Sequence, residues 1–414
     1  MSVQTPPTLL KLARQALQRD EALAICGLRI LPVELLPDLF KEALTGRQPR
    51  LVRAIVATWP FPRLPVGAWM ETPDLETFQA VLAGIDIWLT RKSHPRGKLQ
   101  VLDLRKEPYG AWSIWAAAED GGCSEEPVDE MQVEKVLPRY ALRPRRRGWP
   151  LKVVADLCLR PGLQEEEACF LQWAQQRQGS LQLCCEKMQI WAQPVHVVRQ
   201  VLNLFPPEHI SDLELNTEWG VYTLAHFAPC LGQMRNLRRF SLAPISQNVF
   251  QIGRSATDRE EKCVHKLLSQ FSRLKCLQHL SMTRVHFLRD RMSQALRCLK
   301  KPLETLRITH HRFPGQTEFP SLAARSSFQL KHLHMRGVVL RALDGMALRV
   351  LLKTWQTLCR PWNLTGCKRR TLSSLSSSLP LSKCCQLTQL SLYGNEFSRP
   401  ILGDLLQHTA HWSR

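Results

Sequence analysis

The chain has 414 residues, of which 44% are hydrophobic, and a formal net charge of +20. This apolar fraction is typical of a folded protein and excludes a largely disordered one. The sequence has no secretory signal at its start and no apolar run long enough to span a bilayer. We therefore expect a cytoplasmic protein without membrane contact, with the nucleus as a second compartment. The charge favours an acidic partner, but no zinc-finger spacing or RNA-stacking aromatic motif predicts direct binding to nucleic acid.

Residues 1–48 are expected to form an N-terminal helical segment. An amphipathic stretch begins at residue 8, where Thr8 is a suitable N-cap. Thr8, Leu9, Ala13 and Leu17 have the spacing of an elongin-binding box, with Ala13 where cysteine is usual. Because these positions share one helix face, they predict docking into a groove of a partner protein.

A second short pattern, apolar-Pro-x-x-apolar, occurs twice over residues 31–40 and fits the motif that follows such a box in cullin adaptors. The first copy contains Leu31, Pro32 and Leu35, and the second is Leu36-Pro37-Asp38-Leu39-Phe40. The stretch also resembles the beginning of an F-box. Two interpretations remain open: these residues dock an elongin–cullin module, or they are the core of a helical cap.

Residues 49–98 are predicted to be that helical cap, with helices over 51–59 and 78–89 around a proline-rich loop at 59–65. From residue 99 to the end we expect a repeat array, opened by Leu99-x-x-Leu102-x-Leu104 and interrupted by a loop insertion at about 119–150. The basic run at 143–147 in this insertion is interpreted as a solvated loop, with a nuclear localisation signal as the alternative.

The pattern Leu-x-x-Leu-x-Leu recurs through the second half of the chain. Copies begin at positions 210, 237, 277, 303, 330 and 387, with spacings of 27, 40, 26, 27 and 57. Apolar residues two apart lie on one side of a strand, and a single copy cannot bury them alone, so neighbouring copies must stack. The spacing leaves room for a helix between strands. The sequence therefore predicts an α/β leucine-rich-repeat solenoid, a horseshoe of long repeats near 27 residues, with the N-terminal helical cap.

One copy of the repeat is expected to be damaged. Where a strand is due after Leu358, the chain contains Pro361, which cannot donate to a strand ladder. We therefore predict a break in the sheet near Pro361, with residues 368–378 forming a loop.

Alternate residues of the predicted strands should lie on the concave side of the horseshoe. They form a basic middle with an acidic margin at Asp212 and Glu214, and this pattern favours an acidic protein partner. The candidate concave-face binding residues are Arg239, His279, Arg307, His332, His334 and Arg336.

The sequence predicts no enzyme, no cofactor and no metal site. It lacks the phosphate-binding loop, the nucleophile elbow and the His-Glu-x-x-His pattern. His332 and His334 share a strand face, but no third ligand is evident. The 14 cysteines include no Cys-x-x-Cys pair and are expected to be buried, reduced thiols.

Five stretches, in order along the whole chain, resemble one protein family. They are Thr5-Pro6-Pro7-Thr8-Leu9-Leu10, the tract 31–40, Trp59-Pro60-Phe61-Pro62-Arg63-Leu64-Pro65, Leu99-Gln100-Val101-Leu102-Asp103-Leu104 and Leu231-Gly232-Gln233-Met234-Arg235-Asn236-Leu237. Together they resemble the PRAME family of leucine-rich-repeat proteins.

The resemblance implies a non-enzymatic adaptor that presents a substrate protein to a cullin-RING ubiquitin ligase through elongins. It also implies negative regulation of transcription, with a retinoic acid receptor as a partner, negative regulation of apoptosis and differentiation, and positive regulation of proliferation. The alternative is a transcriptional corepressor or protein-binding scaffold without ligase activity. Under this alternative the chain is a decayed paralogue, an interpretation that the interrupted repeat near Pro361 and the usual continuation of family members beyond the position of residue 414 leave open.

Overall fold

The computed structural model describes residues 20–70, 74–91, 98–106, 150–246, 258–288, 291–310, 332–336, 361–365 and 389–391. The chain divides into two compact units. Unit 1 contains residues 1–156 and 164–184, and unit 2 contains residues 157–163 and 185–414. Within the described ranges, no helix is long and apolar enough to cross a bilayer. The predicted elongin-box helix, the insertion at 119–150 and the tract 368–378 lie outside the described residues.

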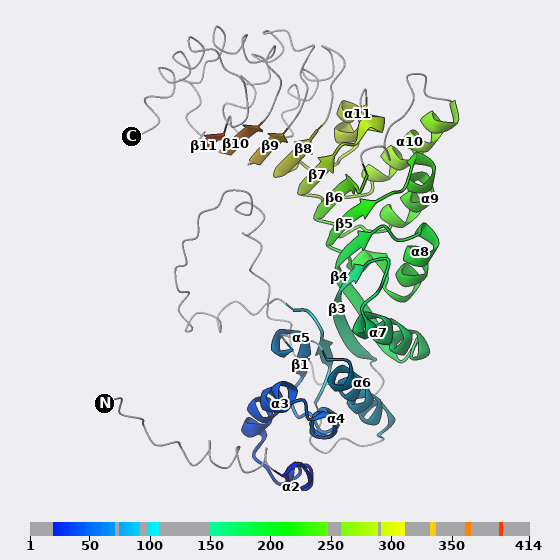
Figure 1. The fold of residues 1–414 in the computed structure, drawn as a ribbon. Helices are drawn as coiled ribbons and strands as arrows, with labels where there is room; N and C mark the ends of the chain where they lie inside the picture. The colour runs from blue at the N-terminus through cyan, green and yellow to red at the C-terminus, as the bar shows by residue number, and fades with distance from the viewer. Residues whose placement is uncertain are drawn as a thin grey trace, which may run out of the picture. The chain divides into compact units, whose positions relative to one another are not determined.

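Unit 1 begins with short helices. They are α2 (Glu21–Gly27), the 3-10 turn η1 (Val33–Leu35), α3 (Leu36–Thr45), α4 (Pro49–Ala57), α5 (Val66–Trp69), α6 (Leu75–Thr90) and, further along the chain, α7 (Glu165–Gln176) (Figure 1). Several have clear start signals: Asp20 and Asp74 accept hydrogen bonds from Leu23 N and Thr77 N at 3.0 and 3.1 Å. Prolines stand in the first turns of α3 and α4, where the missing N–H has no helical partner.

The helices of unit 1 enclose an apolar core. Leu39 and Phe40 of α3 and Leu51 and Ile55 of α4 are each 0% exposed. Phe40 also packs against Trp59, with ring centroids 5.5 Å apart. The second apolar-Pro-x-x-apolar copy, Leu36 to Phe40, is therefore core in this structure.

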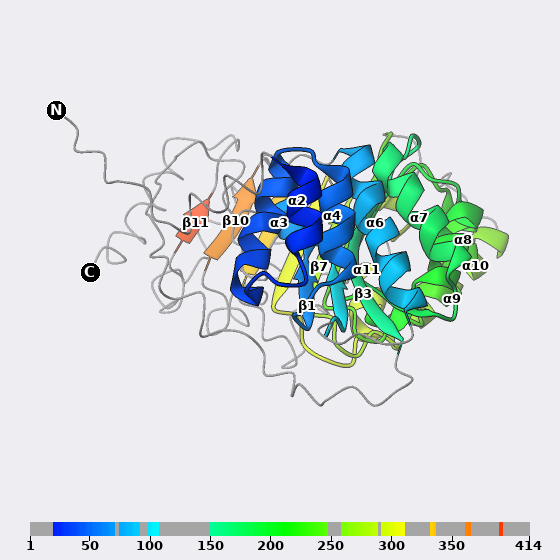
Figure 2. The same cartoon turned by 90° about the horizontal axis from the view of Figure 1, so that it is seen from below.

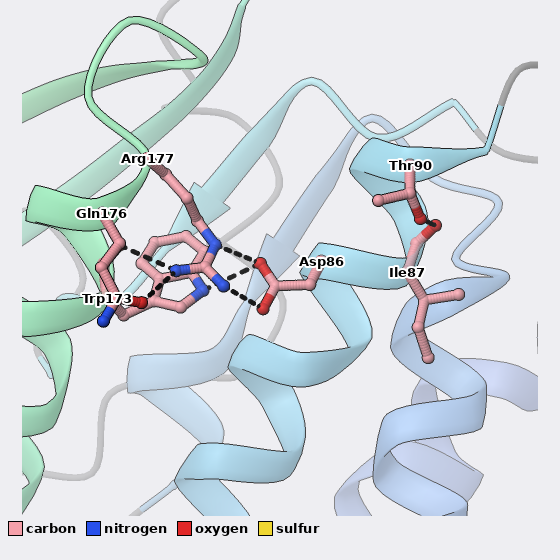
Figure 3. Close-up of polar contacts among 6 residues, drawn as sticks. All are labelled: Asp86, Ile87, Thr90, Trp173, Gln176 and Arg177. Atoms are coloured by element: carbon pink, nitrogen blue, oxygen red, sulfur yellow. Dashed lines mark hydrogen bonds and ion pairs between the residues drawn. The ribbon is translucent and has the colours of Figure 1, made fainter.

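A polar contact joins α6 to α7 and involves Asp86 (Figure 3). Asp86 Oδ1 accepts a hydrogen bond from Trp173 Nε1 at 3.0 Å, and its Oδ2 accepts one from Arg177 Nη2 at 2.5 Å. The guanidinium of Arg177 lies 5.1 Å from the centre of the Trp173 ring. Near the end of α6, Thr90 Oγ1 donates a hydrogen bond to Ile87 O within the same helix, at 3.0 Å. The ion pair and the indole together orient α7 on α6.

All strands of the sheet are in sequence order, and the pairings given below are parallel. Unit 1 holds β1 (Arg63–Pro65), β2 (Val101–Asp103) and the first parts of β3 (Leu151–Leu159) and β4 (Leu181–Trp191). β1 pairs with β2, and β2 with β3. The prediction that residues 59–65 form only a loop was wrong for β1: its Leu64 is 0% exposed, and the pairing with β2 is a tertiary contact that local proline content does not reveal.

Unit 2 contains the end of β4 and a regular alternation of strands and helices. The strands are β5 (Asp212–Thr217), β6 (Arg239–Pro244), β7 (His279–Thr283), β8 (Thr305–Thr309), β9 (His332–Arg336), β10 (Pro361–Thr365) and β11 (Gln389–Ser391). Between them lie α8 (Val195–Leu204), the turns η4 (Pro207–His209) and η5 (His286–Leu288), α9 (Val221–Leu231), α10 (Asp258–Phe271) and α11 (Met292–Arg297). Helices α8 to α11 lie along one face of the strands up to β8 (Figure 1), and α8, α9 and α10 are again together on one side in Figure 2.

The expected α/β architecture, with a parallel sheet and N-terminal helices, is confirmed, and the arrangement is leucine-rich-repeat-like. Leu213 on β5, Leu280 on β7 and Leu306 on β8 are 0–2% exposed, as the repeat pattern predicts. Leu333 and Leu390 occupy the matching positions of β9 and β11. The cysteines follow expectation only in part, since Cys184 and Cys185 are buried but Cys26 is exposed.

The predicted break near Pro361 was wrong. β10 begins at Pro361 and pairs in parallel with both β9 and β11. In the observed register, Trp362 pairs with Leu333 and Leu364 with Met335, so the repeat is displaced by one residue from the position expected after Leu358. Proline is tolerated because it is the first residue of the strand, and pairing with β9 starts only at Trp362.

Candidate functional site

Strands β6, β7 and β8 of unit 2 bury every second side chain. In β6 and β8, Phe240, Leu242, Leu306 and Ile308 are buried, and the residues between them are half-buried. Since successive side chains of a strand lie on opposite faces, the intervening residues occupy the face away from the apolar core. We call this surface the polar face of the sheet.

Parallel register aligns the residues of the polar face into three rows that cross the strands. From β4 to β9, the first two rows are Lys187, Asp212, Arg239, His279, Thr305 and His332, and Gln189, Glu214, Ser241, Ser281, Arg307 and His334. The third row has two paired parts: Trp191, Asn216 and Ala243 on β4 to β6, and Thr283, Thr309 and Arg336 on β7 to β9. Neighbouring members of a row are separated by one strand spacing, about 4.8 Å.

The structure brings all six predicted concave-face residues onto four adjacent strands. Arg239 pairs with His279 across β6 and β7, and Arg307 pairs with His334 across β8 and β9. His332 and Arg336 flank His334 on β9 and are exposed, whereas the other four side chains are half-buried. Sequence reasoning therefore identified a contiguous group, because the repeat register places equivalent positions side by side.

The acidic margin lies on β5. Asp212 Oδ2 is 3.9 Å from Arg239 Nη1 on the next strand. Glu214 accepts hydrogen bonds from Gln189 Nε2 at 2.9 Å and Asn216 Nδ2 at 2.7 Å. The carboxylates are thus held in place, three strands away from the arginine of β8.

Sequence reasoning missed two basic residues that follow β7 and β8 directly. Arg284 and His310 have φ angles of 50° and 51°, in the left-handed region that few non-glycine residues adopt. Arg284 N donates to Thr309 O at 2.9 Å, and His310 N donates to Arg336 O at 2.6 Å. The sequence does contain a signal for this conformation. Arg284 and His310 lie seven positions after the start of their repeats, and the matching position of the next repeat is Gly337, a residue type that adopts positive φ readily.

Two histidines of this region have lowered pKa values. Burial is the main cause of the lowered pKa of His310, and the positive charges of Arg284 and Arg336 lower it further. Burial, the charge of Arg307 and the neighbouring His332 lower the pKa of His334 to about 4. Both imidazoles are therefore neutral at pH 7 and can donate a hydrogen bond without adding to the charge.

The described residues include no group of three or more His, Cys, Asp or Glu side chains that could hold a metal ion. The chemistry that the polar face offers is recognition. Arginine supplies forked N–H donors that match carboxylate or phosphate oxygens, and serine, threonine and neutral histidine supply further hydrogen bonds.

The predicted N-terminal site is only partly described. Thr8, Leu9, Ala13 and Leu17 lie outside the described residues. Leu31 and Leu35 are half-buried, and Pro32 between them is exposed.

A parallel sheet with one buried face, and with rows of mainly polar residues on the other, defines the class of leucine-rich-repeat-like proteins. Family models place the chain more closely: residues 6–112 match the PRAME N-terminal domain, and residues 151–414 match the PRAME C-terminal domain. The chain belongs to the PRAME family, which confirms the resemblance found in the sequence.

Individual relatives agree with this assignment. The chain is 40% identical to human (Homo sapiens) PRAME family member 12 over 421 residues, covering 100% of this chain and 84% of the relative. It is 36% identical to mouse (Mus musculus) preferentially expressed antigen in melanoma-like protein 7, covering 100% and 85%. Among solved structures, the crystal structure of the yeast Rad7 and Elc1 complex contains a chain with 12% identity and a TM-score of 0.39, with 98% of this chain and 91% of that chain covered. A TM-score this low does not establish a shared fold.

Proposed function

We propose that this protein is a substrate-recognition adaptor of a cullin-RING ubiquitin ligase. In this proposal the polar face of the sheet binds the substrate, and the N-terminal segment binds an elongin–cullin module. The observation that carries the proposal is the group of arginine and histidine residues on the polar face of the four adjacent strands β6 to β9, joined to membership of the PRAME family. An adaptor needs no catalytic residue, since it acts by raising the effective concentration of substrate near the ligase.

Exposure of apolar side chains near the first cullin-box-like copy supports docking there. Ile30 is 83% exposed and Leu23 is 56% exposed, and Leu31 and Leu35 are half-buried. The second copy cannot contribute its leucines without unfolding α3, because Leu39 and Phe40 are 0% exposed. The proposed docking site is therefore Thr8, Leu9, Ala13 and Leu17 with Leu31, Pro32 and Leu35, but not the second copy.

The proposal assigns a role to each part of the chain. Residues 1–48 dock the ligase module, residues 49–98 cap the array, and residues 99–414 form a horseshoe solenoid whose concave side is the polar face. The family-type effects on transcription, apoptosis, differentiation and proliferation would then follow from which substrate is removed.

Affinity capture of the full chain from cells, followed by detection of elongin and cullin, tests the ligase half of the proposal. We expect the wild-type chain to recover both. Leu9→Asp and Leu31→Asp should each abolish recovery with little change in melting temperature, since anchor residues of an interface contribute binding energy rather than folding energy. Ile245→Asp is the matched control, because Ile245 is an exposed apolar residue of unit 2, at 43%.

The outcome separates this proposal from a scaffold or corepressor without ligase activity. Failure of the wild-type chain to recover elongin would exclude the adaptor function. Unfolding of Leu9→Asp and Leu31→Asp would instead show that these leucines are cap residues. In either case the polar face would remain as a protein-binding surface of another kind.

A further inference from the structure

Five basic residues lie in the middle of, at the end of or directly after β7, β8 and β9. Arg307 and His334 are register partners, and Arg336 pairs with Thr309 two residues along the same strands. Arg284 and His310 follow Thr283 and Thr309, which are themselves partners. Three adjacent strands therefore place the five within about 10 Å across the sheet. We call these residues the basic cluster.

The backbone fixes the two residues that extend the cluster beyond the strands. Arg284 and His310 have positive φ angles, and their N–H groups donate to Thr309 O and Arg336 O of the next strand. Adjacent Thr309 and Thr283 are joined by a hydrogen bond between their hydroxyl oxygens at 2.8 Å. The edge that carries the cluster is thus ordered by cross-strand contacts before any ligand binds, which lowers the entropic cost of binding.

Arginine charges act on both histidines of the cluster. Besides burial, Arg284 and Arg336 lower the pKa of His310, and Arg307 lowers the pKa of His334. Arginine charges therefore lie near two imidazoles that stay neutral at pH 7. An anion bound among these residues would gain charge-assisted hydrogen bonds.

We propose that the basic cluster binds the phosphate of a phosphorylated serine or threonine in a partner protein. The inference rests on the proposed function, for which it names the feature of the substrate that the polar face recognises. A phosphoryl group carries about −1.5 to −2 charge at neutral pH and three acceptor oxygens, whereas a carboxylate carries one charge. Arg284, Arg307 and Arg336 supply forked donors suited to such a group, and His310 and His334 supply neutral ones.

The acidic margin of the same face disfavours a polyanion. Asp212 and Glu214 on β5 lie three strands from Arg307, which corresponds to about 14 Å. A nucleic acid lying across the strands would bring further phosphates towards these carboxylates, but a single phosphorylated residue would not. The arrangement therefore favours a protein segment with one localised dianion.

Fluorescence polarisation with the full chain tests the inference directly. The probes are three labelled alanine–glycine peptides that differ only in a central phosphoserine, serine or glutamate. We expect the phosphoserine peptide to bind at least about tenfold more tightly than the other two, the effect of about one charge-assisted hydrogen bond. Arg307→Gln and Arg336→Gln should each remove about tenfold of that affinity.

Arg235→Gln is the matched control, since Arg235 is an exposed arginine in the turn between α9 and β6. This variant also loses one positive charge, but at a position outside the polar face, so it should leave peptide binding unchanged. Circular dichroism melting of each variant establishes that it is folded. Arg307→Lys keeps the charge but loses the forked donors, so its affinity should lie between those of wild type and Arg307→Gln.

Three results would overturn the inference: equal binding of the glutamate and phosphoserine peptides, unchanged binding in the folded Arg307→Gln and Arg336→Gln variants, or tighter binding of a labelled single-stranded oligonucleotide lost in the same variants. The assay contains no elongin or cullin. Phosphoserine binding by a chain that recovers no elongin would therefore refute only the ligase function. Recovery of elongin without phosphoserine preference would refute only this inference.

Discussion

Leu280 illustrates how a single side chain supports the sheet. It is 1% exposed on β7, with Phe240 and Leu306 as its partners on the neighbouring strands. Leu280→Ala removes buried methyl groups and leaves a cavity, so it should lower the free energy of unfolding by about 2–5 kcal/mol. Urea denaturation measures this change. Ser281→Ala, on the polar face of the same strand, is the control and should shift the midpoint little; an equally small shift for Leu280→Ala would contradict the burial.

Asp103 is a buried carboxylate between two arginines of unit 1. Its side chain is 7% exposed and accepts hydrogen bonds from Arg105 Nε at 3.0 Å and Arg105 Nη2 at 2.9 Å, and from Arg63 Nη2. Burial alone would raise the pKa of Asp103, but the hydrogen bonds from Arg105 and Arg63 and the charge of Arg105 outweigh it, and the pKa is lowered.

A lowered pKa in the folded state makes stability depend on pH in a definite direction. The contribution of Asp103 is fully present above its ordinary pKa of 3.8 and is lost as the pH falls below that value through the folded-state pKa. Asp103→Asn should cost about 1.5–3 kcal/mol at pH 7, the range for hydrogen bonds to charged groups, and less at pH 3. Thermal melts of wild type and variant across this range measure the difference. A loss of stability that is the same at both pH values would exclude the ion-pair explanation.

At the scale of elements, Gly84 sets how closely α6 approaches α4. A Cβ atom at Gly84 would lie 2.7 Å from Val56 Cβ and 2.8 Å from Arg53 O, which is closer than atoms can pack. Glycine to alanine inside a helix usually stabilises by about 0.5–1 kcal/mol, but here the clash should reverse the sign.

Melting temperatures of the two glycine variants check this prediction. Gly84→Ala should melt below wild type, because the helices must separate to admit the methyl group. Gly162→Ala is the control, since an added Cβ there meets no atom within 4 Å and should have little effect. A higher melting temperature for Gly84→Ala would show that α4 and α6 are less closely packed.

The sequence predicted elements where the determining pattern is local. Leucines spaced two and three residues apart specify strands such as β5 and β8 without reference to the rest of the chain. Leu36 to Phe40 could not be resolved in the same way, because a docking motif and a core helix share one apolar pattern and differ only in what covers it. β10 was missed for two reasons. Its inward-facing positions lie one residue later than those counted from Leu358, and the first of them is Trp362 where the repeat pattern has a leucine.

The candidate site was predictable to the extent that it depends on register. Once the strands are known, alternation places Arg307 and His334 on the same face. Arg284 and His310 were missed because their place in the site depends on a positive φ and on hydrogen bonds to the next strand, and neither is a property of the residue type. The lowered pKa of His334 likewise depends on burial and on Arg307, which only the folded chain brings together.

At the scale of the whole molecule, the order of strands limits how far a local change can spread. Strands β9, β10 and β11 are neighbours in sequence order, and within the described residues each pairs with the strands next to it in that order. Such an arrangement has stability that depends chiefly on nearest-neighbour contacts, so it should open locally rather than all at once.

Asn363→Pro tests this expectation. Asn363 pairs with His334 of β9 and Ser391 of β11, and proline there removes a ladder hydrogen bond from the middle of β10. Hydrogen exchange of β9 and β11 amides should accelerate by about tenfold or more, equivalent to about 1.4 kcal/mol of local stability, while β5 amides keep their wild-type rates. Pro361→Ala is the control, because the first residue of the strand tolerates proline and should tolerate alanine equally. Acceleration that is uniform from β5 to β11 would instead show that the parallel sheet unfolds as a single cooperative unit, and that its strands are coupled well beyond their immediate neighbours.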